Sequence, residues 1–590
     1  MTLPPNTDLW EHEAAASGAR LVVLLGIGSA QRLAAAQTRL AAPPAGPVVL
    51  VVEADLDLLA ALLSSTDAES LVHRPGQDLW AAAPAPDGAL PDGDRADAEA
   101  FFRTNLEAAA VRSARDARLL PCELSLRQHP RFYAAVVSAW KQALARHLLD
   151  MASQDEFAAL LVRNRIANLR FLPESLTAQR LFAVAHGGQP RPAIVVGAGP
   201  SLDRNVHLLA ALSRHAFVIA TDTAIAPLLR AGAEPHLAVA GDPQEEIARR
   251  FEGMDTGRCI LVTELSVHPR VHRCHPPSRT AFATFEDPFT AFLERHLRPL
   301  GRLDVWGSVV TMATDLARRM GCNPVVFAGV DSAYTGGRCY CSGSRPHDDA
   351  LRTKAGSESW TEVWSRYRHG RPVIEERDIF GGYQPTLRSL IAYRDWLQSY
   401  ARSHPELLML NATGGGALGG SELFSGSHCG AGGGEIRQVA LDDFAHRLGR
   451  SLRSRTDAGP WERLQAATMP IAGASASAEQ ISHLGREALR RLQAARADFR
   501  AAGHAARTSD TARALGLVQR LEVEQYEVFR WIAAIAGETR RELTIAALPE
   551  LCDAYERAAD ELTAAWSSAT QSCDGAAQAP PANSERGTVA

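Results

Sequence analysis

The chain has 590 residues, of which 46% are hydrophobic and 22% charged, and its 62 basic and 67 acidic side chains give a formal net charge of −5. This length predicts several domains with buried cores. The near-neutral balance argues against a dominant basic surface for nucleic acid or acidic lipid, and no apolar run approaches the roughly 18 residues that cross a bilayer.

The cysteines and the N-terminus indicate the compartment. Nine cysteines occur without a C-x-x-C pair, which predicts reduced thiols rather than a disulfide framework. The first residues, MTLPPNTDLWEHEAAA, lack the basic-then-apolar order of a secretory signal. We therefore expect a cytoplasmic protein of bacterial type with no membrane span.

Residues 1–82 predict a small N-terminal α/β domain, because two strand–helix units follow each other closely. Gly26 and Gly28, with Glu53 downstream, resemble a dinucleotide or methyl-donor fold, but the third glycine is missing and a structural role is favoured. Asp55 and Asp57 match the Asp-x-Asp of metal-dependent glycosyltransferases, although capping of the next helix explains them better.

Residues 83–178 predict a linker followed by a helical connection. The stretch 81–98 is rich in Ala, Pro, Gly and Asp and has no periodicity, which is typical of a loop. Amphipathic patterns then predict two helices, at about 131–149 and 155–170.

Residues 179–430 predict a Rossmann-like core with a doubly wound sheet. Short apolar runs such as AIVV, FVIAT, LAVA and NPVVFA alternate with helical segments and end in Gly, Asp or Thr. Such sheets bind ligands at the carboxyl ends of their strands.

Residues 431–570 predict an all-α C-terminal domain. From position 436 onward we find no convincing strand pattern, and Ala, Leu, Arg and Glu recur at helical spacing. The small, polar residues 571–590 predict a disordered tail.

GAGPSL, residues 197–202, is the sharpest local motif. Gly197 and Gly199 permit a tight turn, and Pro200 and Ser201 open a helix whose free amides attract an anion such as phosphate. The alternative is a plain strand–helix turn without a ligand.

Further polar residues follow other strands of the predicted sheet. Asp222, Asp242 and Asp331 could bind ribose or sugar hydroxyls or a metal, or act as a base; each could instead cap a helix. Ser308 is a cap or a phosphate contact. Asn411 and Thr413 precede a glycine-rich run. They either lie beside a nucleotide or sugar or belong to a flexible loop without a ligand. Cys339, Cys341 and His347 match no standard zinc pattern.

In this order, AIVVGAGPSLDRNVHLL, FVIATDTAIAPLLRAGAEPHLAVAGDPQ, GSVVTMATDLARRMGCNPVVFAGVDSAYTGG and NATGGGAL resemble the motility accessory factor (Maf) flagellin glycosyltransferases. The core of that family is related to 6-hydroxymethylpterin diphosphokinase. The resemblance implies transfer of a nonulosonic acid, of the pseudaminic or legionaminic type, from its CMP-activated form to Ser or Thr of flagellin. It implies no certain cofactor, with Mg²⁺ optional.

The resemblance also implies roles for individual residues. CMP would be held near its phosphate by the 197–201 turn, and the reacting side would carry Asp331 and Tyr334. The nucleotide and sugar would be bordered by Asp222, Thr223, Asp242, Ser308, Asn411 and Thr413. Where Maf-like proteins tend to have a Thr-His pair after GVDSAYTGG, this chain has CYCSG, so His347 is the closest substitute for a base.

Two alternatives remain open. One is an ATP- and metal-dependent diphosphokinase acting on a pterin alcohol. The additional N-terminal and helical regions argue against it, because they suit a protein acceptor better than a small molecule. The other is a noncatalytic nucleotide- or flagellin-binding protein that kept the sheet and lost the base, which the CYCSG departure supports.

Overall fold

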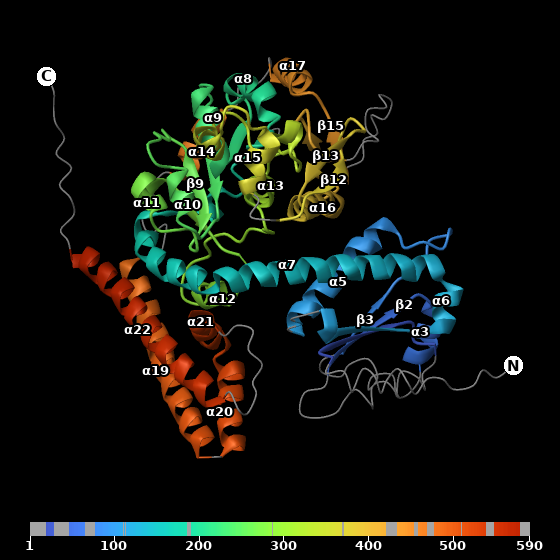
Figure 1. Ribbon diagram of the computed structural model, residues 1–590, viewed down its shortest axis with the longest axis vertical. Coiled ribbons are helices and arrows are strands. Elements are labelled where there is room, and N and C mark those ends of the chain that lie inside the picture. The colour runs from blue at the N-terminus through green and yellow to red at the C-terminus, as the bar shows by residue number, and fades with distance from the viewer. Residues whose placement is uncertain are drawn as a thin grey trace. The chain divides into compact units, whose positions relative to one another are not determined.

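The computed structural model describes residues 19–28, 47–64, 77–109, 111, 114–185, 190–285, 287–367, 371–419, 434–452, 458–468, 477–508, 510–537 and 548–578. The chain forms two compact units, Met1–Glu156 and Phe157–Ala590, shown in Figure 1. Within the described ranges no helix has both the length and the apolar character that a membrane span requires.

The first unit is built on a parallel four-stranded sheet with the order β3-β2-β1-β4. Its strands are β1 (Leu21–Leu25), β2 (Val48–Glu53), β3 (Gln77–Ala81) and β4 (Ala117–Pro121). Its helices are α3 (Leu56–Leu63), α5 (Asp92–Ala108), α6 (Glu123–Gln128) and the first part of α7 (Pro130–Asn168). Because β4 pairs with β1, this unit extends well beyond the predicted boundary at residue 82.

Two expectations for residues 83–178 differ from the structure. The predicted linker contains the start of α5, whose buried Ala98, Phe102 and Leu106 recur every four residues and form one helix face. The two helices predicted at 131–149 and 155–170 are one continuous helix, α7, because the DMASQD sequence between them contains no Gly or Pro.

Glu53 closes the glycine turn of the first unit from inside. Its fully buried carboxylate accepts hydrogen bonds from the backbone N–H groups of Ile27 (2.6 Å), Ala54 (2.9 Å) and Asp55 (2.8 Å). The favoured structural role of Glu53 is therefore the one observed, since its oxygens are engaged by the protein. Asp55 accepts from Leu58 N at 2.9 Å in the first turn of α3, as capping predicts.

The second unit contains a parallel nine-stranded sheet with the order β15-β14-β11-β6-β7-β8-β9-β10-β5. Its strands are β5 (Leu176–Thr177), β6 (Ala193–Val196), β7 (Phe217–Thr221), β8 (Leu237–Ala240), β9 (Ile260–Glu264), β10 (Thr280–Ala283), β11 (Val325–Ala328), β14 (Met409–Asn411) and β15 (Ile436–Gln438). In the register, Val195 of β6 lies between Ile219 of β7 and Phe327 of β11.

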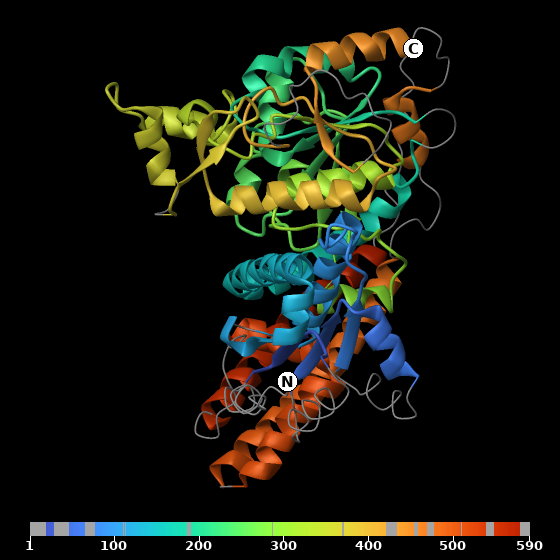
Figure 2. The same cartoon turned by 90° about the vertical axis from the view of Figure 1, so that its right-hand side faces the viewer.

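Helices cover both faces of this sheet, which confirms the predicted doubly wound α/β fold. One face packs on α8 (Leu202–Leu212), α9 (Ile225–Arg230) and α17 (Leu441–Leu452). The other packs on α13 (Val309–Arg319), α16 (Arg388–Ser403) and α18 (Pro460–Thr468), and Figure 2 shows α16 in gold beside α13. Both faces are buried, so the strands are almost continuously apolar rather than alternating.

Smaller elements complete the sheet region. The short helices are α10 (Glu246–Arg249), α11 (Val271–Cys274), α12 (Pro288–Glu294), α14 (Arg345–Thr353) and α15 (Trp360–Tyr367), and β12 (Ile374–Arg377) pairs with β13 (Tyr383–Thr386) as an antiparallel hairpin.

The predicted C-terminal helical domain is confirmed, with different limits. It comprises α19 (Ala478–Arg507), α20 (Thr511–Glu524), α21 (Tyr526–Ala536) and α22 (Leu548–Gln578), and Figure 1 shows α19 and α22 side by side. Its core continues into α12 and the end of α7. The prediction that no strand follows from residue 436 onward is wrong, because Ile436–Gln438 form β15, which pairs with β14. Helices α17 and α18 also belong to the sheet region, since they cover its two faces.

The tail prediction for residues 571–590 also differs in part. Helix α22 continues to Gln578, and residues 579–590 lie outside the described residues.

Three buried histidines make the second unit sensitive to acid. Burial lowers the pKa of His236 and His272 to about 3 and that of His275 to about 4. Below about pH 6.5 the unfolded chain binds protons at these sites while the folded chain does not, so stability falls as pH decreases towards 4. We expect a loss approaching about 1.4 kcal/mol per pH unit for each histidine in that window.

Urea unfolding from pH 7 to pH 4.5 checks this expectation. His236→Asn can keep an acceptor for Val218 N, which donates to Nδ1 of His236 at 3.0 Å in the wild-type protein. It should reduce the pH slope by up to about 1.4 kcal/mol per pH unit. An unchanged slope in this variant would show that His236 does not contribute.

Candidate functional site

The nine-stranded sheet has one topological switch point, between β6 and β11. From β6 the chain builds β7, β8, β9 and β10 outward on one side, whereas β11 pairs on the other side. The loops that leave β6 and β11 therefore diverge at the carboxyl edge, which is where open α/β sheets bind ligands. The GAGPSL motif is the β6 loop, and Gly329–Ser332 begins the β11 loop.

The two loops interlock through their backbones. Gly199 N donates to Gly329 O at 2.8 Å. A Cβ on Gly197 would lie 2.5 Å from Gly329 O, and one on Gly199 would lie 2.1 Å from Oδ1 of Asp331. Glycine is therefore required at both positions for close approach of the β11 loop.

We expect Gly199→Ala to lower the free energy of unfolding by about 1–3 kcal/mol, because the added methyl group must displace the Asp331 carboxylate. Gly356→Ala is the matched control, since a Cβ there meets nothing within 4 Å, and it should change stability by less than about 0.5 kcal/mol. Equal stability of the two variants in urea unfolding would contradict the interlocked arrangement.

Asp331 joins the two loops with its side chain. Its carboxylate is buried and accepts from Ser201 Oγ (2.6 Å), Ser201 N (3.2 Å) and Thr335 Oγ1 (2.5 Å). Burial raises the pKa of Asp331, while the bonds from Ser201 and Thr335 oppose that rise. The sequence predicts a phosphate at the start of α8. The carboxylate of Asp331 occupies that position instead.

Asn411, Thr413 and Tyr334 support these loops. Thr413 Oγ1 accepts from Val330 N at 3.3 Å, and Asn411 Nδ2 donates to Leu418 O at 2.8 Å. Tyr334 is buried and its N–H donates to Pro385 O at 2.8 Å. The described bonds of these three residues hold the β11 and β14 loops in place.

A second polar cluster lies at the ends of β7 and β8. Arg250 forms an ion pair with buried Asp222 and lies 3.8 Å from Oδ2 of Asp242. The Asp222 charge raises the pKa of Arg250, and burial raises the pKa of Asp242. Burial raises the pKa of Tyr340, and the charges of Arg250, Asp222 and Asp242 also act on it because they lie nearby. The guanidinium of Arg250 lies at both carboxylates, so the positive charge beside Asp222 and Asp242 comes from the protein itself.

Thr223 and Ser308 border the same edge. Thr223 Oγ1 donates to Oδ1 of Asp222 at 3.4 Å. Ser308 caps α13, with its Oγ accepting from Val310 N at 3.3 Å, and a Cβ on Gly241 would lie 3.7 Å from Val309. The N-terminus of α13 therefore faces the end of β8.

His347 lies on α14 rather than in either loop. Its buried ring stacks on Trp360 with centroids 5.0 Å apart, and Nδ1 is 3.8 Å from Oδ1 of Asp348. Burial lowers the pKa of His347, and the nearby charge of Arg338 lowers it further. These contacts connect α14 with α15.

The CYCSG departure has a structural role that sequence reasoning missed. Cys341 N donates to Ala198 O at 2.8 Å, and Ser342 N and Arg338 both bind the carboxylate of Asp203, each at 2.8 Å. Residues 338–342 thus lie against the glycine turn and the start of α8. Within the described ranges, no group of three or more His, Cys, Asp or Glu side chains is placed to hold a metal.

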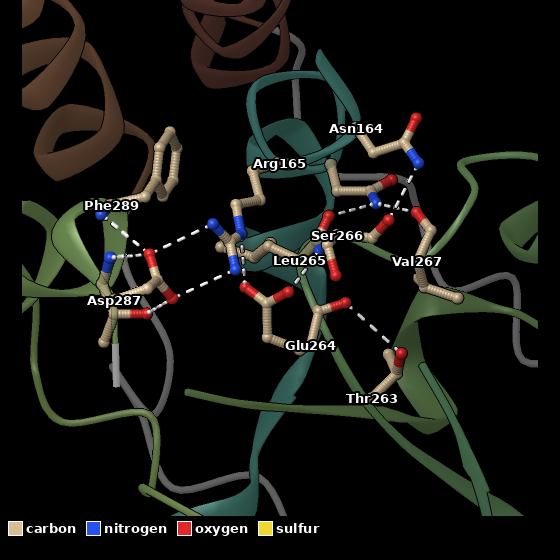
Figure 3. Close-up of polar contacts among 11 residues, drawn as sticks. Asn164, Arg165, Thr263, Glu264, Leu265, Ser266, Val267, Asp287 and Phe289 are labelled. Atoms are coloured by element: carbon tan, nitrogen blue, oxygen red, sulfur yellow. Dashed lines mark hydrogen bonds and ion pairs between the residues drawn. The ribbon is translucent and has the colours of Figure 1, made fainter. Parts of the chain in front are cut away.

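The end of α7 adds polar residues that sequence patterns did not reveal, shown in Figure 3. Arg165 binds Glu264 (3.0 Å) at the end of β9 and Asp287 (3.0 Å) at the start of α12. Burial lowers the pKa of Arg165, but the two carboxylates outweigh that effect and raise it above its ordinary value. Asn164 Nδ2 donates to Pro243 O and Ser266 O, both at 2.8 Å. These bonds hold the loops after β8 and β9.

Among three comparisons with known proteins, the family model is the one that bears on the predicted core. Residues 163–337 match the family model described as 6-hydroxymethylpterin diphosphokinase MptE-like, which confirms the MptE-like core. A search of curated proteins gives no significant match. The chain is similar to the solved structure of the Maf glycosyltransferase from Magnetospirillum magneticum AMB-1, with a TM-score of 0.48 and 15% identity over 97% of this chain and 83% of that chain.

Proposed function

We propose that this protein is a glycosyltransferase that moves a nonulosonic acid from its CMP-activated donor to Ser or Thr of flagellin. The observation that carries the proposal is the carboxyl edge of the nine-stranded sheet, which has its switch point between β6 and β11 and carries the partly exposed carboxylate of Asp242 after β8. The motif resemblance supplies the donor and the acceptor. Such a transfer needs a place for the leaving phosphate and a group that deprotonates the acceptor hydroxyl.

The donor is expected over the β6 and β7 ends. Gly197, Gly199 and Pro200 would form its backbone floor, with Ser201 and Asp331 fixing the loops beneath. Because Asp331 occupies the first turn of α8, we place the phosphate nearer Ser308, where the positive end of the α13 dipole faces the edge. Thr223 would contact the nucleotide from β7, and Asn411, Thr413 and Tyr334 would shape the opposite wall.

Flagellin is the expected acceptor, and the long amphipathic helices α19 and α22 offer surfaces for a helical partner. Mg²⁺ is not required by this proposal, because Arg250 lies at the Asp222 and Asp242 carboxylates where a cation would bind.

A second candidate is favoured by the family model, whose description names a pterin diphosphokinase. In that case the same edge would bind ATP with Mg²⁺ and a pterin alcohol, and no protein would be modified.

Mass spectrometry of flagellin tests the proposal. Purified protein, CMP-pseudaminic or CMP-legionaminic acid and unmodified flagellin should yield flagellin with one or more added nonulosonic acid masses on Ser or Thr, together with free CMP. Absence of sugar transfer, combined with Mg²⁺-dependent conversion of ATP to AMP in the presence of 6-hydroxymethylpterin, would establish the diphosphokinase instead.

A further inference from the structure

We propose that Asp242 is the catalytic base, the residue that takes the proton from the acceptor hydroxyl. This inference rests on the proposed glycosyl transfer and assigns one step of it. Asp331 and Tyr334, which the resemblance places on the reacting side, and His347, its substitute for a base, then have positioning or structural roles.

Accessibility separates the three strand-end carboxylates. Arg250 pairs with both Asp222 and Asp242, but the side chain of Asp222 is 2% exposed, whereas that of Asp242 is 31% exposed. Asp331 is buried and already accepts three hydrogen bonds. A base must come within about 3 Å of the hydroxyl that it deprotonates, so Asp242 is the carboxylate of this set that an acceptor can reach.

The two oxygens of Asp242 have different surroundings. Oδ1 accepts from Gln244 N at 2.9 Å, which fixes the carboxylate orientation. Oδ2 lies 3.8 Å from Arg250, within ion-pair distance but beyond hydrogen-bond distance, and we assign it as the oxygen that takes the proton. The loop itself is held by Asn164, whose Nδ2 donates to the carbonyl of the next residue, Pro243. The same Nδ2 donates to Ser266 O, and Figure 3 shows Asn164 beside Ser266.

The charges around Asp242 suit proton transfer. Burial raises its pKa, and the charges of Asp222 and Glu246 raise it further, while the Gln244 N–H and Arg250 act in the opposite direction. His268 also faces this site, since the charges of Glu246 and Asp242 act on its ring, whose pKa burial lowers. A carboxylate with a raised pKa is a stronger base than an ordinary one.

The acceptor O–H gives its proton to Oδ2 of Asp242 as the acceptor oxygen forms a bond to the anomeric carbon. The bond from that carbon to the phosphate oxygen breaks, and its electron pair leaves with CMP. Asp242 then releases the proton to water. Neither an oxidant nor a metal is needed.

Asp242→Asn, assayed with two acceptors, tests the assignment. With a flagellin hydroxyl acceptor and a CMP-nonulosonic donor, the variant should lose about 10²–10⁴-fold in rate. Azide attacks without giving up a proton, so transfer to azide should stay within about threefold of the unchanged protein. The acid limb of the wild-type pH–rate profile for hydroxyl transfer should also disappear in the variant. Asp255→Asn, in an exposed loop where Oδ1 binds Gly257 N, is the matched control and should behave as wild type.

Each other outcome has a distinct meaning. Hydroxyl transfer within about threefold of wild type in Asp242→Asn would overturn the assignment. Equal loss with azide and with hydroxyl would also overturn it, since Asp242 would then act on the donor or on the fold. A wild-type protein that cleaves no CMP donor with either acceptor would refute the transferase function itself, and the need for a base with it.

Discussion

Replacing Asp331 by alanine is expected to lower the free energy of unfolding of the second unit by about 3–4 kcal/mol and to abolish CMP binding. The substitution leaves Ser201 N, Ser201 Oγ and Thr335 Oγ1 without their buried acceptor. The β6 and β11 loops would then keep their backbone contacts but lose the side-chain bonds that fix their conformation.

Thr335→Val is the matched control for Asp331→Ala, because it removes a single bond to the same carboxylate and should cost about 1 kcal/mol. Urea unfolding and CMP titration of both variants provide the comparison. If Asp331→Ala remained within 1 kcal/mol of wild type and still bound CMP, Asp331 would not be the group that holds the site together.

Arg165→Ala is expected to cost about 3–5 kcal/mol, the largest loss of stability that we predict, because it leaves one buried and one partly buried carboxylate without their cation. Arg165 has an exposed side-chain fraction of 11%, against 1% for Glu264 and 18% for Asp287. Loss of this contact would release α7 from β9 and α12, and with α7 the loop that carries Asp242.

Arg163→Ala is the control on the same helix. Its ion pair with Glu561 is about half exposed on both sides, so its removal should cost less than about 1 kcal/mol. Urea unfolding of the two variants checks the difference, and similar losses from both would show that burial does not determine the strength of the Arg165 contacts.

The main elements of the second unit follow from local sequence patterns. The apolar runs of β6, β7, β8 and β11 predict buried parallel strands, and their order predicts the doubly wound sheet. Strand β15 escaped prediction because three residues, Ile436–Gln438, carry too little pattern, and only pairing with β14 makes them a strand.

The candidate site is predictable only in part, for a physical reason. Sequence places Asp222, Asp242 and Asp331 at strand ends, but whether each carboxylate is exposed depends on residues far along the chain. Asp331 is bound by Ser201, 130 positions away, and the Arg165 contacts span 99 and 122 positions. Local motifs contain no information about such partners, so the three roles could not be separated before the structure.

Calorimetric titration of CMP into the wild-type protein and Gly199→Ala, with ATP and Mg²⁺ as the competing ligand, shows whether the switch point binds a cytidine nucleotide. We expect CMP to bind the wild-type protein without a metal. Gly199→Ala, checked for folding by circular dichroism, should bind at least about tenfold more weakly because the added methyl group displaces Asp331. Mg²⁺-dependent ATP binding without any CMP binding would contradict a nucleotide-sugar site at the switch point.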